Sequence, residues 1–227
     1  MDIQLTDDAI ADPQALAVAL RPLLTRHPVP QSDERTRGMI VEFGWGEGKL
    51  DNGTSDDGTP DWAEVPALRM LLALFTGARD AINILAINEN PPAAPDSFML
   101  RPHVDRRWLP DGFGRHAPRW TAVAFLDFPP GGQGGELVVF PPDAFAQAEP
   151  AGRADARRRV EAHRGMLIAP KPGRLCRFAG AHPHAVLGYG CAPTDPWRMT
   201  AVLAEFAPRA DEPAPREFVP REFVPPP

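Results

Sequence analysis

Hydrophobic residues recur at helical spacing in two segments of the first third of the chain. In the first segment, Asp12 and Pro13 form a typical helix start, a capping carboxylate followed by proline. The apolar face of this helix consists of Leu16, Leu20, Leu23 and Leu24. Pro22 leaves the end of this helix undecided. A second helix is predicted over residues 66–76, with Gly77 after its end. Its apolar face consists of Leu68, Leu71, Leu72 and Phe75.

From residue 82 onward, the apolar segments become short and are bounded by turn residues, which is typical of strands. The predicted strands are residues 39–43, 82–88, 98–101, 120–128, 136–140, 165–169, 174–178 and 199–206. Residues 129–135, Pro-Pro-Gly-Gly-Gln-Gly-Gly, predict a tight turn that returns the chain from 120–128 into 136–140. A basic helix is predicted over residues 154–164. Residues 44–60 lack periodicity and are rich in Gly, Asp, Asn and Thr, so we expect a long exposed loop there.

Strands joined by turns, with helices mostly before them, predict an α+β, mainly β protein with a sandwich or barrel core. A chain of 227 residues is long enough for one substantial core. We expect a single domain over residues 1–208, with a helical part at about 1–80 and a β core at about 82–206. Residues 209–227 form a proline-rich tail that contains Arg-Glu-Phe-Val-Pro twice, and we expect it to be extended.

Composition excludes several classes of function. The net charge of −6 argues against nucleic-acid binding, and no apolar run is long enough to predict a membrane span. The two cysteines, Cys176 and Cys191, come with no predicted signal peptide, so we expect no disulfide and a cytoplasmic localisation. The small size of the chain, with no peptide-binding module visible in the sequence, favours a small-molecule substrate as the partner, and the oligomeric state stays open.

The candidate chemistry begins at His103-Val-Asp105 and continues at the distant His184. Two histidines and one carboxylate can form a facial triad that leaves positions of an octahedral metal open, as in non-haem Fe(II) oxygenases. A His-x-Asp sequence alone is weak support, since a surface His–Asp pair is the more common explanation of it. His182 competes with His184 as the third ligand.

The order of motifs around these residues resembles the prolyl-4-hydroxylase-like branch of the 2-oxoglutarate/Fe(II) dioxygenases. The resemblance covers about residues 82–206. The matching pieces are His103-Val-Asp105, Gly134-Gly-Glu-Leu137, Pro170-Lys-Pro-Gly-Arg-Leu-Cys-Arg-Phe178, His184-Ala-Val186 and Arg198-Met-Thr200. The connection at residues 185–197 is longer than the turn that the family usually has there. A longer loop costs little free energy, so the match of Arg198 is kept.

The resemblance implies a fold, a site and a set of cofactors. The fold is a double-stranded β-helix, a jelly-roll of two facing sheets with the metal at one open end, and N-terminal helices would pack on it. It implies that His103, Asp105 and His184 hold Fe(II), and the spacing from Phe178 favours His184 over His182. It further implies that Arg198 pairs with the distal carboxylate of 2-oxoglutarate, assisted by the Thr200 hydroxyl. O2 is then the co-substrate, and ascorbate is an additional candidate.

The function implied is hydroxylation of a C–H bond of a small metabolite or amino-acid-like substrate, with release of succinate and CO2. Halogenation is not expected, because the carboxylate ligand Asp105 is present. Three alternatives stay open at this point. A cupin-like metalloenzyme would use the same triad without 2-oxoglutarate and would not need Arg198. A prolyl or peptidyl hydroxylase would act on a protein, and a jelly-roll binding domain would hold no metal.

Overall fold

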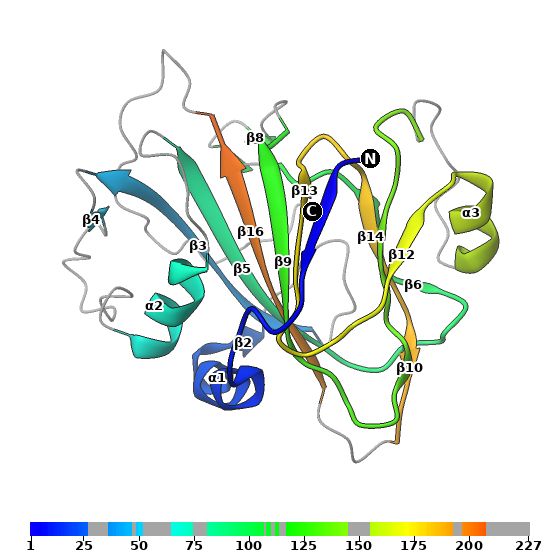
Figure 1. Cartoon of the computed structure of the whole chain (residues 1–227), viewed down its shortest axis with the longest axis horizontal. Helices are drawn as coiled ribbons and strands as arrows, with labels where there is room; N and C mark the ends of the chain where they lie inside the picture. Colours follow the sequence, from blue (N-terminus) through cyan, green and yellow to red (C-terminus); the bar gives the residue numbers. More distant parts are fainter. Residues whose placement is uncertain are drawn as a thin grey trace.

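The computed structural model describes residues 1–26, 36–46, 49–51, 65–74, 81–106, 108–109, 112–113, 117–144, 155–192 and 197–207. Two antiparallel sheets dominate this part of the chain (Figure 1). The larger is eight-stranded, in the order β1-β13-β9-β16-β5-β3-β2 with β4 beside β3, and the smaller has the order β12-β11-β14-β6. The protein is therefore mainly β, with the two facing sheets of a double-stranded β-helix, which confirms the predicted fold class.

The larger sheet combines strands of eight to ten residues with shorter ones. They are β1 (Ile3–Thr6), β2 (Thr25–Arg26), β3 (Arg37–Gly46), β4 (Lys49–Asp51), β5 (Ile82–Asn90), β9 (Trp120–Asp127), β13 (Leu175–Ala179) and β16 (Arg198–Phe206). The smaller sheet contains β6 (Phe98–His103), β11 (Leu137–Val139), β12 (Met166–Ile168) and β14 (His184–Leu187). Two short pairs complete the strands: β7 (Trp108–Leu109) with β8 (Gly112–Phe113), and β10 (Gln133–Gly134) with β15 (Tyr189–Gly190).

The predicted N-terminal helices pack on the outer face of the larger sheet (Figure 1). Helix α1 (Pro13–Leu20) begins at Asp12, whose carboxylate accepts a hydrogen bond from the Ala15 N–H at 2.9 Å, and it continues into the 3-10 turn η1 (Arg21–Leu23). Helix α2 (Pro66–Ala73) ends before the predicted residue 76; residues 75–77 lie outside the described part. The apolar faces of both helices are buried against Leu85, Ile87, Ala122, Ala124, Met199, Ala201 and Leu203.

The alternation of side chains along each strand separates two further cores. Val123 and Phe125 of β9 point into the space between the sheets, where they meet Phe178 and Val139. On the opposite face of the smaller sheet, Val138 and its neighbours pack against α3 (Ala156–Ala162). Each sheet is thus covered by helix on its outer side and by the other sheet on its inner side.

One predicted connection is wrong. The chain does not return from β9 through a tight turn into an adjacent strand, because β11 lies in the smaller sheet and pairs with β12 and β14. Residues 129–135 instead cross from one sheet to the other, and Gly131, Gly134 and Gly135 adopt positive φ there. A glycine-rich segment between two apolar runs indicates a change of direction, but it does not say which strand becomes the neighbour.

The predicted loop at residues 44–60 is wrong in its first part. Residues 44–46 are the end of β3, and β4 pairs with them as a hairpin. Backbone pairing of this kind needs no apolar periodicity, which is why the composition concealed it. Residues 52–60 lie outside the described part of the chain. Six further strands were not predicted at all, namely β1, β2, β7, β8, β14 and β15, and β10 lies in the segment predicted as a turn.

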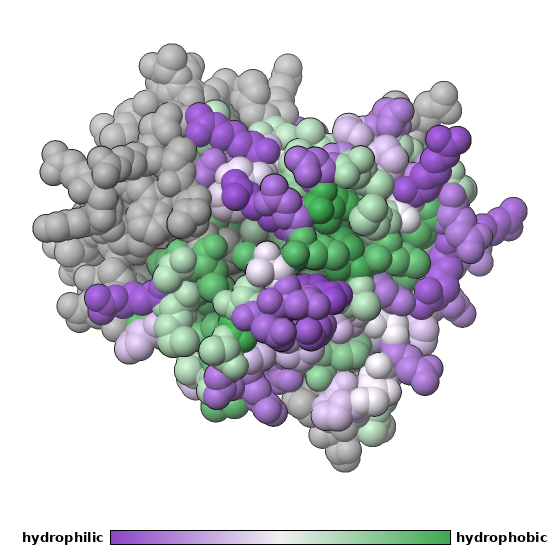
Figure 2. All heavy atoms as spheres, in the orientation of Figure 1, coloured by the Kyte–Doolittle hydropathy of each residue, from purple (hydrophilic) through white to green (hydrophobic). Residues whose placement is uncertain are grey.

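The described surface includes exposed hydrophobic side chains. Figure 2 shows a hydrophobic area on the viewed face near β12, where Met166 and Leu167 are exposed. No helix among the described residues is long and apolar enough to cross a membrane. Cys176 and Cys191 are free thiols. The single domain over residues 1–208 stays a prediction, and the tail at 209–227 lies outside the described residues.

Candidate metal centre

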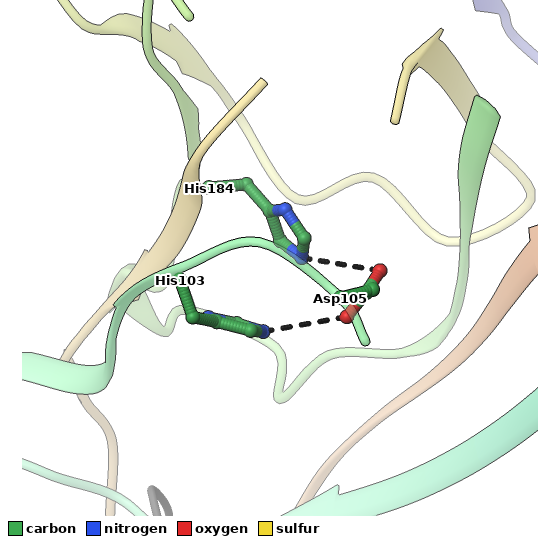
Figure 3. A group of neighbouring side chains, drawn as sticks. All are labelled: His103, Asp105 and His184. Carbon is green, nitrogen blue, oxygen red and sulfur yellow. Dashed lines mark ion pairs between the residues drawn. The ribbon is translucent and has the colours of Figure 1, made fainter. Parts of the chain in front are cut away.

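Two neighbouring strands of the smaller sheet bring the predicted ligands together. Strand β6 ends at His103, strand β14 begins at His184, and these two residues face each other in the antiparallel pair. Asp105 lies just beyond the end of β6, so it is held by the following loop and not by the strand. Figure 3 shows the three side chains pointing toward one another.

The distances within this group are those of a site that can hold one ion. The Asp105 carboxylate lies between the imidazoles, with Oδ1 3.5 Å from His103 Nε2 and Oδ2 3.6 Å from His184 Nε2. One ligand atom from each residue falls within 4.8 Å of the others. The imidazole centroids are 4.3 Å apart and the ring planes are tilted by 51°. All three ligand atoms therefore converge on one point from one side, as a facial arrangement requires.

Hydrogen bonds from outside the group orient it. His103 Nδ1 donates to the Arg101 carbonyl at 2.9 Å, which leaves the Nε2 lone pair directed at the shared centre. The Thr121 hydroxyl, at the beginning of β9, donates to Asp105 Oδ2 at 3.1 Å. Because Thr121 belongs to the larger sheet, this hydrogen bond fixes the carboxylate between both sheets.

The electrostatics suit a divalent cation. Burial lowers the pKa of His184 to about 4, so this imidazole is neutral and able to ligate at neutral pH. Burial acts in the same direction on His103, but the Asp105 carboxylate outweighs it and raises the pKa. Burial would raise the pKa of Asp105, yet the two imidazoles and the Thr121 hydroxyl hold it well below its usual range. The site thus presents an ionised carboxylate between two imidazoles.

His182 occupies a different position from its predicted competitor. Its Nδ1 is 2.7 Å from the Phe140 carbonyl, and it does not belong to the group of ligand atoms found in the described part of the chain. The centroid of the His184 ring instead lies 5.3 Å from that of the Phe178 ring, with the two planes tilted by 60°. The geometry therefore brings His184 together with His103 and Asp105, while His182 contacts the backbone beside β11.

Arg198 is the second unusual feature of the interior. It is only 1% exposed, and it begins β16 on the face that points between the sheets, where its guanidinium lies 5.8 Å from the Phe125 ring. Its Nε and Nη1 have no hydrogen-bond partner among the described residues. Burial lowers the pKa of this guanidinium to about 10. Thr200, two residues further along the same face, is also buried.

Comparison of the whole fold finds similar solved structures, whereas comparison of the sequence finds no match. No protein-family model and no curated protein matches the chain. The structure of the Fe(II)/(alpha)ketoglutarate-dependent dioxygenase TqaL matches with a TM-score of 0.51 at 9% identity, over 92% of this chain and 84% of that one. IDO from Bacillus thuringiensis matches with a TM-score of 0.50 at 12% identity, over 91% and 93%. A Pseudomonas putida prolyl-4-hydroxylase is 18% identical, with a TM-score of 0.48 over 91% and 93%.

At these identities the likeness to TqaL and to IDO shows a shared fold. The chemistry of this chain must be argued from its own residues. Thr121 and Tyr189, which contact Asp105 and Arg198 respectively, were missed in the sequence. Neither has a local pattern that distinguishes it from an ordinary strand residue.

Proposed function

We propose that this protein is an Fe(II)- and 2-oxoglutarate-dependent dioxygenase that hydroxylates a C–H bond. The observation that carries the proposal is Arg198. A buried guanidinium whose Nε and Nη1 have no hydrogen-bond partner among the described residues is costly, so its retention in the interior favours an anionic ligand. A carboxylate is the natural one, because it can accept two parallel hydrogen bonds from a guanidinium.

The donor set of the metal centre supports iron. Imidazole and carboxylate ligands on one face, with the remaining positions open, are the arrangement of non-haem Fe(II) oxygenases. The side chains of His103 and Asp105 are 16% and 21% exposed to solvent, so the site is open to solvent on one side. When bound together, Fe(II) and 2-oxoglutarate would reduce O2, converting 2-oxoglutarate to succinate and CO2 and placing the second oxygen atom on the substrate carbon.

Each residue of the chain then has a defined part. His103, Asp105 and His184 would hold the metal, and the hydroxyl of Thr121 would keep the carboxylate turned toward it. Thr121 faces Ala204 across the β9–β16 pair, and Arg198 lies six residues before Ala204 on the same inner face of β16. Arg198 would bind the distal carboxylate of 2-oxoglutarate, with the Thr200 hydroxyl on the same face as a second donor.

The substrate we propose is a small metabolite or an amino-acid-like compound. This rests on the absence of any predicted peptide-binding module in the sequence. We also propose ascorbate as an auxiliary reductant. Residues 1–208 would form a single domain, and the protein would be located in the cytoplasm. TqaL, whose fold is similar, is an Fe(II)/(alpha)ketoglutarate-dependent dioxygenase, and this supports the proposal of the same two cofactors here.

The test is an anaerobic titration of the Fe(II)-loaded protein with 2-oxoglutarate, followed by the visible metal-to-ligand charge-transfer band. We expect a saturable band in the wild type and none in His103→Ala. Arg198→Ala should retain the metal but need on the order of 100-fold more 2-oxoglutarate, since a charged bidentate contact is worth about 3 kcal/mol. Stoichiometric metal without any band would refute 2-oxoglutarate as the co-substrate. A band of unchanged affinity in Arg198→Ala would remove Arg198 from the proposal.

A further inference from the structure

The single tyrosine of the chain lies directly behind Arg198. Tyr189 is fully buried, in the short strand β15, within the connection between His184 and Arg198. Its hydroxyl accepts a hydrogen bond from the Arg198 backbone N–H at 3.0 Å and donates one to the Asn90 carbonyl at 2.7 Å. Asn90 and Arg198 face each other in the last pair of the β5–β16 ladder. The phenol therefore joins the two strands at the residue that carries the guanidinium.

The Tyr189 hydroxyl binds the backbone of β16 at a point where the sheet offers it no β9 partner. Strand β9, the other neighbour of β16, reaches only to Asp127, which faces Met199, and the register shifts immediately after that pair. Arg198 thus lies at the end of the sheet, one residue beyond the last β9–β16 pair, with no β9 residue opposite it. A strand end of this kind frays unless another group bonds its backbone. The Tyr189 hydroxyl supplies that bond from a different part of the fold.

The tyrosine is itself held by the glycine-rich crossing segment. Strand β10 pairs with β15 so that Gly134 faces Tyr189, and the Gly135 N–H donates to the Gly188 carbonyl at 3.0 Å. A Cβ at Gly134 would lie 2.5 Å from that carbonyl oxygen, so a side chain there would push β15 away. The ring also packs 5.5 Å from Phe128. The glycines that carry the chain between the sheets therefore also seat the phenol.

We propose that Tyr189 is the positioning residue of the anion site: its hydroxyl fixes the backbone of Arg198 so that the guanidinium enters the interior ready to bind the distal carboxylate of 2-oxoglutarate. The identity of this anion rests on the proposed function. Tyr189 contacts neither His103, Asp105 nor His184, so it acts on the affinity for the co-substrate and not on the affinity for the metal. The unusually long connection at residues 185–197 is then the segment that carries this tyrosine.

The test compares the wild type with Tyr189→Phe, which keeps the ring and removes only the hydroxyl. Each protein is loaded with Mn(II), titrated with 2-oxoglutarate by calorimetry, and examined by hydrogen–deuterium exchange of the β16 amides. We expect the dissociation constant for 2-oxoglutarate to rise about tenfold and the first β16 amides to exchange about tenfold faster, because the Arg198 N–H loses its buried hydrogen bond to the hydroxyl. The affinity for Mn(II) should change by less than about twofold, since the metal ligands are untouched.

Val138→Ala is the matched control, because it opens a cavity in the core under α3 without contacting β16. It should lower thermal stability while leaving the affinity for 2-oxoglutarate and the exchange of the first β16 amides as in the wild type. Equal 2-oxoglutarate affinity and equal exchange in Tyr189→Phe and wild type would overturn the positioning role. Failure of the wild type itself to bind 2-oxoglutarate would overturn the proposed function instead, and the exchange measurement would still decide whether Tyr189 fixes Arg198.

Discussion

Replacing Arg198 by methionine should make the unliganded protein more stable while abolishing its affinity for 2-oxoglutarate. Burial lowers the pKa of the guanidinium from 12.5 to about 10, which corresponds to about 3 kcal/mol against the charged form. The contact with the Phe125 ring returns about 1 kcal/mol of this. Methionine has a similar length and no charge, so Arg198→Met should raise the free energy of unfolding by about 2 kcal/mol. For a chain of this size that is a rise in Tm of about 4–8 °C.

The assay is thermal unfolding of the Mn(II)-loaded protein with and without 2-oxoglutarate. At about 100 times its dissociation constant, the co-substrate should stabilise the wild type by about 2.7 kcal/mol and should leave Arg198→Met unchanged. Arg177→Met is the matched control, because Arg177 is only partly buried and stacks 4.1 Å from Trp120 on the outer face of the sheet. It should not gain stability and should keep the response to 2-oxoglutarate. An Arg198→Met variant less stable than the wild type would refute the cost assigned to burying this charge. A variant that 2-oxoglutarate still stabilises would refute the role of Arg198 in binding it.

Three further predictions test the surroundings of the site. Thr121→Val removes the donor to Asp105, so the affinity for Fe(II) measured by competition with a chelator should fall about tenfold; unchanged affinity would contradict it. Gly188→Ala places a Cβ against the Ala94 carbonyl oxygen and should lower the free energy of unfolding in urea by about 2–4 kcal/mol; a neutral effect would show that β15 can move. Asp7 has its pKa lowered from 3.8 to about 2 by its ion pairs, so its stabilising effect is complete above pH 3.8 and is lost as the pH falls through 2. Acid unfolding of Asp7→Asn should lack this contribution, and identical acid profiles would contradict the assignment.

The sequence predicted the parts of the fold that depend on local pattern. The helices at Pro13–Leu20 and Pro66–Ala73 follow from periodic leucines and from proline at the first position. Each predicted strand lies within a few residues of a strand in the structure, because apolar runs bounded by turn residues are a strong local signal. The strand β14 was missed, since His184 begins it and its four residues are too few to show a period.

The pairing of strands could not be predicted in the same way. The crossing of residues 129–135 between the sheets was mistaken for a hairpin because glycine permits both conformations. Which one forms is decided by contacts distant in sequence, above all the pairing of Gly134 with Tyr189. The same applies to the site: the order of His103, Asp105, His184 and Arg198 was visible as a motif, whereas the hydroxyls that orient them come from other strands.

The most direct test of the account is a crystal structure of the protein loaded with Fe(II) and the inert 2-oxoglutarate analogue N-oxalylglycine, with anomalous data at the iron edge. We expect one anomalous peak within bonding distance of His103 Nε2, His184 Nε2 and the Asp105 carboxylate. We also expect ligand density that starts at this peak and ends with a carboxylate on the Arg198 guanidinium. Iron bound elsewhere would contradict the assignment of the triad as the iron site. Iron at the triad with no anion on Arg198 would contradict the binding of 2-oxoglutarate between them.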